Sequence, residues 1–101
     1  MNWQDDYKKR VASFPAAVRD AHARSSKHRA EVQGSARCGC FHCCATFAPI
    51  EIAEWVDEDQ SGLGQTALCP KCGIDSVLGD RSGFPVSSDF LASMKAHWFS
   101  D

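Results

Sequence analysis

The chain has 101 residues, of which 44% are hydrophobic, and a formal net charge of −2 at pH 7. These values fit one small globular domain and exclude a disordered chain. No stretch is long and apolar enough to span a membrane, and the charged N-terminus lacks an apolar signal segment, so we expect a cytoplasmic protein without membrane contact. In that compartment, six cysteines favour metal binding over disulfide formation.

The two parts of the chain carry opposite charge. Residues 1–37 contain eight Lys or Arg against four acids, giving +4, and residues 38–101 contain three against nine, giving −6. We expect the basic part to be attracted to the acidic part within the molecule, although its cations are also the candidates for binding nucleic acid. These cations are Lys8, Lys9, Arg10, Arg19, Arg24, Lys27, Arg29 and Arg37.

Residues 1–37 are predicted to form a basic helical arm, with helix over residues 4–32. The helix should break at Phe14, because a residue before proline is disfavoured in a helix, and Pro15 should open the second helix. Gly34 is the expected C-cap. Spacings of three and four residues place one stripe on the inner face of the second helix, 16–32, which we expect to pack on the rest of the chain. The stripe is Val18, Ala21, Ser25, His28 and Val32.

His28 is the candidate polar residue of that stripe. Burying it without a hydrogen bond would cost about 1–3 kcal/mol, so it should have a partner. A backbone carbonyl near the first cysteine pair and a metal-bound thiolate are the candidates. The simpler interpretation is a core histidine whose hydrogen bonds are satisfied.

Residues 38–79 contain all six cysteines and are predicted to form a zinc module. Two C-x-x-C pairs, separated by 25 residues, have the spacing that closes a tetrahedral sulfur site around one structural zinc ion. A redox dithiol is disfavoured because no thioredoxin-like βαβ pattern surrounds either pair. The predicted ligands are Cys40, Cys43, Cys69 and Cys72.

Three further residues crowd the first pair. Cys38 and Cys44 are left over, and free cysteines are most often small buried hydrophobic groups. Cys38 with Cys40 also forms a C-x-C pair, so an alternative ligand register stays open. His42 lies between the paired cysteines, where we expect it to shield the metal. Together with His28, these residues are the candidates for contact with the metal-bound sulfurs.

The segments beside the second pair decide the type of zinc module. Residues 49–56 slightly favour helix over strand, residues 59–65 form a turn-rich loop, and residues 66–68 form a short strand. After Cys72, apolar residues at helical spacing predict a helix that ends at Gly79. A helix there would define a treble clef, which we favour, whereas hairpins at both pairs would define a zinc ribbon, the runner-up.

Residues 80–101 are predicted to form a loop, 80–85, and then a helix over residues 87–99. Ser87 or Ser88 should cap this helix. Its buried face should contain Phe90, Leu91, Met94 and Trp98. His97 is expected at the surface, where the helix dipole favours it, and Trp55 is expected in the core. The predicted fold is thus α+β and mostly helical, with residues 1–101 forming a single small zinc-binding domain packed with N- and C-terminal helices.

Two resemblances accompany these patterns. The segment "ALCPKCGIDSVLG" resembles the strand, C-x-x-C-G, helix corner of GATA-type fingers and of zinc-bearing HNH nucleases. A second resemblance covers residues 22–99 and rests on the segments "HRAEV", "CGCFHC", "FAPIEIAEW", "TALCPKCGIDSVLGD", "GFPV" and "FLASMKAHWF". Over these segments the chain resembles a widespread group of small bacterial proteins called cytoplasmic proteins or hypothetical zinc proteins. This resemblance implies one bacterial cytosolic domain and no particular activity.

The chemistry of these residues favours a non-enzymatic role. A nuclease of the HNH type needs a histidine base and further ligands, but Gly73 follows Cys72, and neither residues 54–65 nor residues 73–80 contain a histidine. Zinc bound by four thiolates has no open position for a substrate. We therefore predict a module that binds another protein, with nucleic-acid binding through the basic arm as the alternative and an HNH-like nuclease as the least favoured function.

Overall fold

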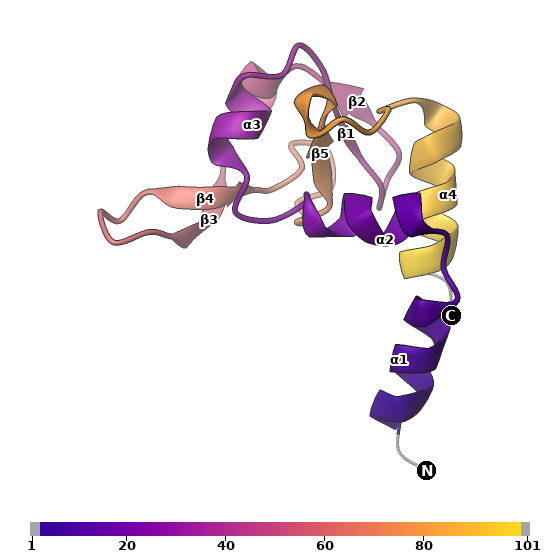
Figure 1. The fold of residues 1–101 in the computed structure, drawn as a ribbon. Helices are drawn as coiled ribbons and strands as arrows, with labels where there is room; N and C mark the ends of the chain where they lie inside the picture. The colour runs from indigo at the N-terminus through magenta and orange to yellow at the C-terminus, as the bar shows by residue number, and fades with distance from the viewer. Residues whose placement is uncertain (1–2, 100–101) are drawn as a thin grey trace.

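The computed structural model describes residues 3–99 of the chain as an α+β structure (Figure 1). The helices are α1 Trp3–Ala12, α2 Ala16–Ala23, α3 Arg29–Gln33 and α4 Ser88–Trp98, with two 3-10 helices, η1 Pro49–Glu51 and η2 Asp80–Ser82. The strands are β1 Cys38–Cys40, β2 Thr46–Phe47, β3 Trp55–Glu58, β4 Gly64–Ala67 and β5 Val77–Gly79. Helices cover fewer than half of the residues, so the expectation of a mostly helical protein was too strong.

The strands form two small antiparallel sheets. One sheet has the order β2-β1-β5, and β3 and β4 form a separate hairpin. In the first sheet, Cys38 pairs with both Phe47 and Gly79, which brings β5 beside β1 from far along the chain. Both cysteine pairs lie beside these strands, so the pairing of the strands positions the two halves of the site.

The three-stranded sheet separates two hydrophobic cores. Cys38, Cys40 and Val77 belong to one core together with Val32 of α3. Leu78 belongs to the other core, which α2 and α4 cover and which contains Phe14, Val18, Ala21, Phe41, Leu91 and Met94. The sheet is therefore buried on both faces, and helices α2 and α4 pack together in one of the two cores.

The break at Pro15 is confirmed, but the second predicted helix is interrupted. It ends at Ala23 and resumes at Arg29, so the prediction of one helix over 16–32 was wrong. The intervening backbone bonds to β4 instead of continuing the helix: the N–H of Lys27 donates to Thr66 Oγ1 at 2.8 Å, and the N–H of His28 donates to the Gln65 carbonyl at 2.8 Å. The five residues of the predicted stripe are nevertheless all buried, so the arm from residue 14 onward is docked.

The segment between the two pairs is less helical than expected. Only the short η1 turn forms after Ala48, where the N–H of Ala48 donates to the Glu51 carboxylate at 2.8 Å. The chain then extends into β3, so the leaning toward helix over residues 49–56 was wrong. A turn at residues 59–63 joins β3 to β4, and β4 includes most of the short strand expected over 66–68.

The predicted helix after Cys72 is also absent. Residues 77–79 form β5, which pairs with β1 along its whole length. Val77 and Leu78 contact opposite cores, as side chains of a strand do, because successive residues point to opposite faces. The defining helix of a treble clef is therefore missing, and both cysteine pairs lie on turns that lead into strands.

The C-terminal helix forms as expected. Ser87 is the N-cap, and its hydroxyl accepts a hydrogen bond from the N–H of Phe90 at 3.3 Å. Leu91 and Met94 are buried, whereas Phe90 and Trp98 are half-buried. The preceding segment contains the η2 turn in addition to the expected loop.

Candidate metal centre

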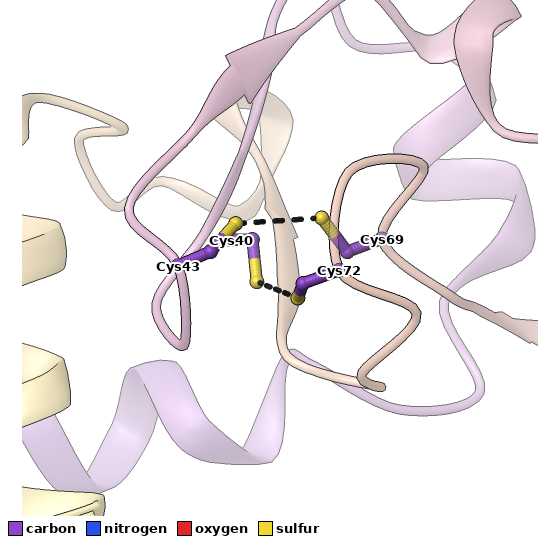
Figure 2. Close-up of side chains that lie close together, drawn as sticks. All are labelled: Cys40, Cys43, Cys69 and Cys72. Atoms are coloured by element: carbon purple, nitrogen blue, oxygen red, sulfur yellow. Dashed lines mark hydrogen bonds between the residues drawn. The ribbon is translucent and has the colours of Figure 1, made fainter.

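Four cysteine sulfurs converge from two turns of the chain. Cys40 and Cys43 lie on the turn between β1 and β2, and Cys69 and Cys72 lie on the turn that follows β4 (Figure 2). The Sγ atoms of Cys40 and Cys72 are 3.7 Å apart, as are those of Cys43 and Cys69, and all four sulfurs lie within 4.8 Å of one another. A tetrahedron with Zn–S bonds of about 2.3 Å has edges of about 3.8 Å. The four sulfurs therefore fit one zinc ion.

The two turns share one backbone pattern. The N–H of Cys40 donates to the Ala45 carbonyl at 3.0 Å, and the N–H of Cys69 donates to the Ile74 carbonyl at 2.9 Å. Within each turn, the N–H two residues after the first cysteine donates to its sulfur at 3.3 Å. These bonds favour the thiolate form, because a hydrogen bond to the charged form stabilises it.

The surroundings shift the pKa values of Cys40, Cys43 and Cys72. Burial raises the pKa of Cys40 well above its ordinary value, and burial also raises the pKa of Cys72. Burial acts in the same direction on Cys43, but the Ala45 N–H and the neighbouring sulfurs outweigh it and lower the pKa of that thiol. A bound divalent zinc ion supplies the positive charge that buried thiolates need, since coordination deprotonates a thiol.

These observations define a small α+β protein with one structural zinc site. Four sulfur ligands complete the tetrahedral shell of zinc, so such a site holds the chain together and leaves no position for a substrate. Cys40 and Cys69 are buried, whereas Cys43 and Cys72 reach the surface, so the site lies at the edge of its core. The predicted set of four ligands is brought together in full.

Cys38 lies away from this cluster. It is fully buried in the core on the same face of β1 as Cys40. Burial, assisted by the negative charge of Asp80, raises the pKa of its thiol to about 11. It therefore acts as a small hydrophobic core residue, as the simpler interpretation expected, and the alternative C-x-C register has no support.

Cys44 follows the first pair and is half-buried against the core that contains Leu78. Its backbone has a φ of 62°, in the left-handed region. Its N–H donates to the Cys40 carbonyl at 2.8 Å and closes the turn. Its sulfur is not part of the four-sulfur cluster, so its contribution to the site is made by the backbone.

His42 contacts the site through its backbone. Its N–H donates to the sulfur of Cys40, while its ring packs edge-on against Phe99 with the centroids 4.8 Å apart. The ring Nδ1 is buried and makes no hydrogen bond to any described residue. The hydrogen bond from His42 to a sulfur of the site is therefore made by the main chain, while the imidazole contacts Phe99.

His28 lies in the arm and contacts no thiolate. Its Nδ1 bonds to the Arg24 carbonyl at 2.8 Å, and its Nε2 accepts from the N–H of Ala67 at 3.2 Å. This pattern assigns the neutral tautomer with the proton on Nδ1. Burial lowers its pKa, against the weaker opposing effects of the Arg24 carbonyl and Glu31. Of the two interpretations, the satisfied core histidine is confirmed, and both proposed partners near the metal were wrong.

His97 and Trp98 of α4 both contact the N-terminal arm, so the expectations for these two side chains need correction. His97 is half-buried, with its ring 4.9 Å from that of Phe14, so it is not a plain surface residue. Trp98 is only partly buried, and its Nε1–H donates to the Val18 carbonyl at 3.2 Å. These contacts fix α4 against the start of α2.

A second surface feature lies around Trp55, which was expected in the core but is half-buried. The guanidinium of Arg29 lies over the Trp55 ring, 4.5 Å from its centroid, and its Nη1–H donates to the Gly64 carbonyl at 2.8 Å. Beside this pair, Ile50 is 92% exposed. The residues border one shallow hollow on the protein surface with Pro49 and Ile52. Only the proline before Ile50 hinted at a turn that would expose it.

Comparison of the chain with protein-family models, curated proteins and solved structures finds no match.

Proposed function

We propose that this chain is a non-catalytic zinc-folded module that binds another protein in the bacterial cytosol. The observation that carries the proposal is the almost complete exposure of Ile50, at 92%, beside the half-buried Trp55. A large apolar side chain held in solvent next to an aromatic ring is the composition of a protein-binding surface. The bacterial cytosol follows from the sequence resemblance. No helix in the described part of the chain is long and apolar enough to cross a membrane.

The chemistry of the hollow indicates which kind of protein segment would bind there. Of the described residues that border it, Arg29 alone carries a charge. Stacking on Trp55 and bonding to Gly64 hold its guanidinium in place, so the donors that remain are already oriented. The surface therefore suits a protein segment in which an apolar side chain adjoins a carboxylate, the apolar group contacting Ile50 and the carboxylate contacting Arg29.

Support for a non-catalytic role comes from the zinc shell and from β5. The four thiolates leave zinc no open position. Strand β5 occupies the place of the helix that supplies further ligands in the HNH nucleases that the sequence resembles. A metal-dependent nuclease would need both features changed.

Nucleic-acid binding through the arm is the second candidate, and the arm's positive charge favours it. Several of its cations already make intramolecular contacts, however. Arg24 pairs with Glu31, Arg29 stacks on Trp55, and Arg37 donates to Thr46 Oγ1 at 2.7 Å. Fewer cations therefore remain for phosphate groups.

The test is a comparison of variants in capture experiments from a bacterial lysate treated with nuclease. Ile50→Asp should lose specific proteins that the wild type retains. The control is Leu63→Asp, which changes an exposed apolar residue away from the hollow, on the β3–β4 hairpin, and it should retain these proteins. Purified partner should then bind wild type and not Ile50→Asp in calorimetry. If both variants bind like the wild type, the surface is not the binding site; retention that requires nucleic acid and disappears with added salt would favour the second candidate.

A further inference from the structure

Helix α1 extends away from the rest of the molecule (Figure 1). Residues 5–10 are all exposed, and only Val11, near its end, is half-buried against the core that holds Phe14. Tyr7 is 44% exposed. Residues 6–10 of this helix thus lie outside both hydrophobic cores.

Such a helix is not expected to be stable by itself. Isolated helices shorter than about 12–15 residues are marginal in water, because nucleation is costly and most helix stability in proteins comes from packing. Helix α1 has 10 residues. Its charge order agrees with its dipole, since acidic residues occupy the first turn and basic residues the last, but this contributes only modestly. A packing partner for the exposed face would supply what is missing.

The charge order also indicates which partner fits. Asp6 and Arg10 are four residues apart, so they lie on the same side of the helix, next to Tyr7. The Arg10 guanidinium lies 5.8 Å from the centroid of the Tyr7 ring. If a second α1 packs antiparallel with the two-fold axis level with residue 8, the two Tyr7 side chains lie on either side of the axis, and Asp6 of each helix lies level with Arg10 of the other. Antiparallel packing also places opposite ends of the two helix dipoles side by side.

We propose that α1 is a self-association helix, which pairs antiparallel with α1 of a second copy of this chain through Tyr7, Asp6 and Arg10. The arrangement has two-fold symmetry, so one patch serves both copies. A helix of this length is about 15 Å long. The interface is therefore at the small end of specific interfaces, and we expect a weak dimer that exchanges with monomer in the micromolar range or above.

The test reverses one charge in each of two variants, so that opposite charges face each other only when one variant pairs with the other. Asp6→Arg places arginine at both positions and Arg10→Asp places aspartate at both, so each variant repels its own copy. In a mixture, both contacts become Arg–Asp pairs. Sedimentation velocity from low micromolar to submillimolar concentration should show association for the wild type, monomer for each variant alone, and heterodimer for the equimolar mixture. The helical signal in circular dichroism should rise with association.

Matched controls exclude a general charge effect. Asp20→Arg and Arg19→Asp make the same charge changes at exposed positions of α2, and each should associate as the wild type does. A variant that simply loses α1 could not be rescued by mixing, so rescue separates pairing from misfolding. A wild type that stays monomeric throughout, or a mixture that stays monomeric where the wild type associates, would overturn the proposal.

Discussion

Cys44 and Gly73 occupy the same position in the two zinc-binding turns. Each follows the second cysteine of its pair, and each has a left-handed backbone, with φ of 62° for Cys44 and 81° for Gly73. Each N–H donates to the carbonyl of the first cysteine, at 2.8 Å in the first turn and 2.9 Å in the second. The site thus requires a left-handed residue after each pair, and only one of the two positions has the residue type that favours it.

Gly73→Ala should destabilise the zinc-bound fold by about 1–2 kcal/mol, the cost of a left-handed conformation for a residue with Cβ. A Cβ at this position would meet no atom within 4 Å, so the effect is conformational and not steric. Gly73→Asn should cost less, because asparagine tolerates this region better. Thermal unfolding of the zinc-loaded proteins measures the order of their stabilities.

The reverse change at Cys44 serves as the control. Cys44→Gly relieves the same strain but removes a half-buried side chain, so we expect stability within about 1 kcal/mol of the wild type and full zinc content. If Gly73→Ala were as stable as the wild type, the left-handed requirement inferred from the two turns would be wrong.

The zinc ligands could be predicted because their signal is local. A C-x-x-C pair fixes its own turn, and two pairs suffice to specify a site. The strand after Cys72 could not be predicted in the same way. Val77 and Leu78 are both fully buried because the sheet has a core on each face. A short apolar run that is buried on all sides has no period that separates strand from helix.

Prediction from sequence was limited in a different way in the N-terminal arm. The helical stripe correctly identified the buried residues, yet Ser25 and His28 are buried in a non-helical segment. Lys27, between them, has a φ of 51°, and its N–H bonds to Thr66. The helix is interrupted by hydrogen bonds to a strand 39 residues away in sequence, which no pattern within the arm reveals.

Single cysteine substitutions should distinguish the cysteines that bind zinc from the neighbouring cysteines that do not. Cys40→Ser should lose zinc, whereas Cys38→Ser and Cys44→Ser should retain one zinc per chain, because neither sulfur belongs to the four-sulfur cluster. Cys38→Ser should still lower stability, since it places a hydroxyl in a fully buried position. Elemental analysis gives the zinc content.

Cobalt substitution supplies an independent control for this set. The charge-transfer and ligand-field bands of tetrahedral cobalt with four thiolates should be the same in the wild type and in Cys44→Ser. Bands typical of three sulfur ligands in Cys44→Ser would place this residue in the site and contradict the assignment.

Removal of zinc should unfold the sheet that links the two turns. Binding free energies of structural zinc in small domains are about 10–16 kcal/mol, which is comparable to or larger than the whole stability of a domain of this size. Chelation should therefore abolish the cooperative thermal transition and the dispersion of amide resonances from β1 and β5, and zinc should restore both. A chelated protein with an unchanged transition would show that the metal is not structural.

Gly79 should not tolerate even a methyl group. A Cβ there would lie 2.2 Å from the Ser35 Oγ. That hydroxyl donates to the Glu31 carbonyl at 2.8 Å and accepts from the N–H of Arg81 at 3.1 Å, so it joins α3 to η2. Gly79→Ala should cost about 1–3 kcal/mol, because the serine must move and its partners lose a hydrogen bond.

A double-mutant cycle tests that mechanism. In a Ser35→Ala background the colliding hydroxyl is gone, so Gly79→Ala should cost clearly less than it does in the wild type. Urea unfolding of the four zinc-loaded proteins measures the coupling. Strictly additive costs would show that Ser35 is not the group that restricts Gly79.

His28 should make stability depend on pH. In the folded chain its Nε2 accepts from the N–H of Ala67, and a protonated ring would present a donor there instead. Burial lowers its folded pKa below the ordinary 6.5, against the smaller raising effects of the Arg24 carbonyl and of Glu31, while the positive charge of Arg24 lowers it slightly further. The unfolded chain therefore binds a proton first as the pH falls. The stability from neutral His28 is fully present above about pH 6.5 and declines below it, toward the lowered folded pKa.

A non-titrating replacement isolates this effect from protonation of the zinc thiolates. In His28→Gln, the amide can donate to the Arg24 carbonyl and accept from Ala67, so it should keep most of the stability at pH 7.5 and lose less than the wild type between about pH 6.5 and pH 5. His28→Ala leaves the Ala67 N–H without its partner and should cost about 1–3 kcal/mol at every pH in this window. Thiolate protonation affects all three proteins equally, so the difference between the wild-type and glutamine curves belongs to His28. Parallel curves for the two would mean that the buried ring does not change its protonation on unfolding.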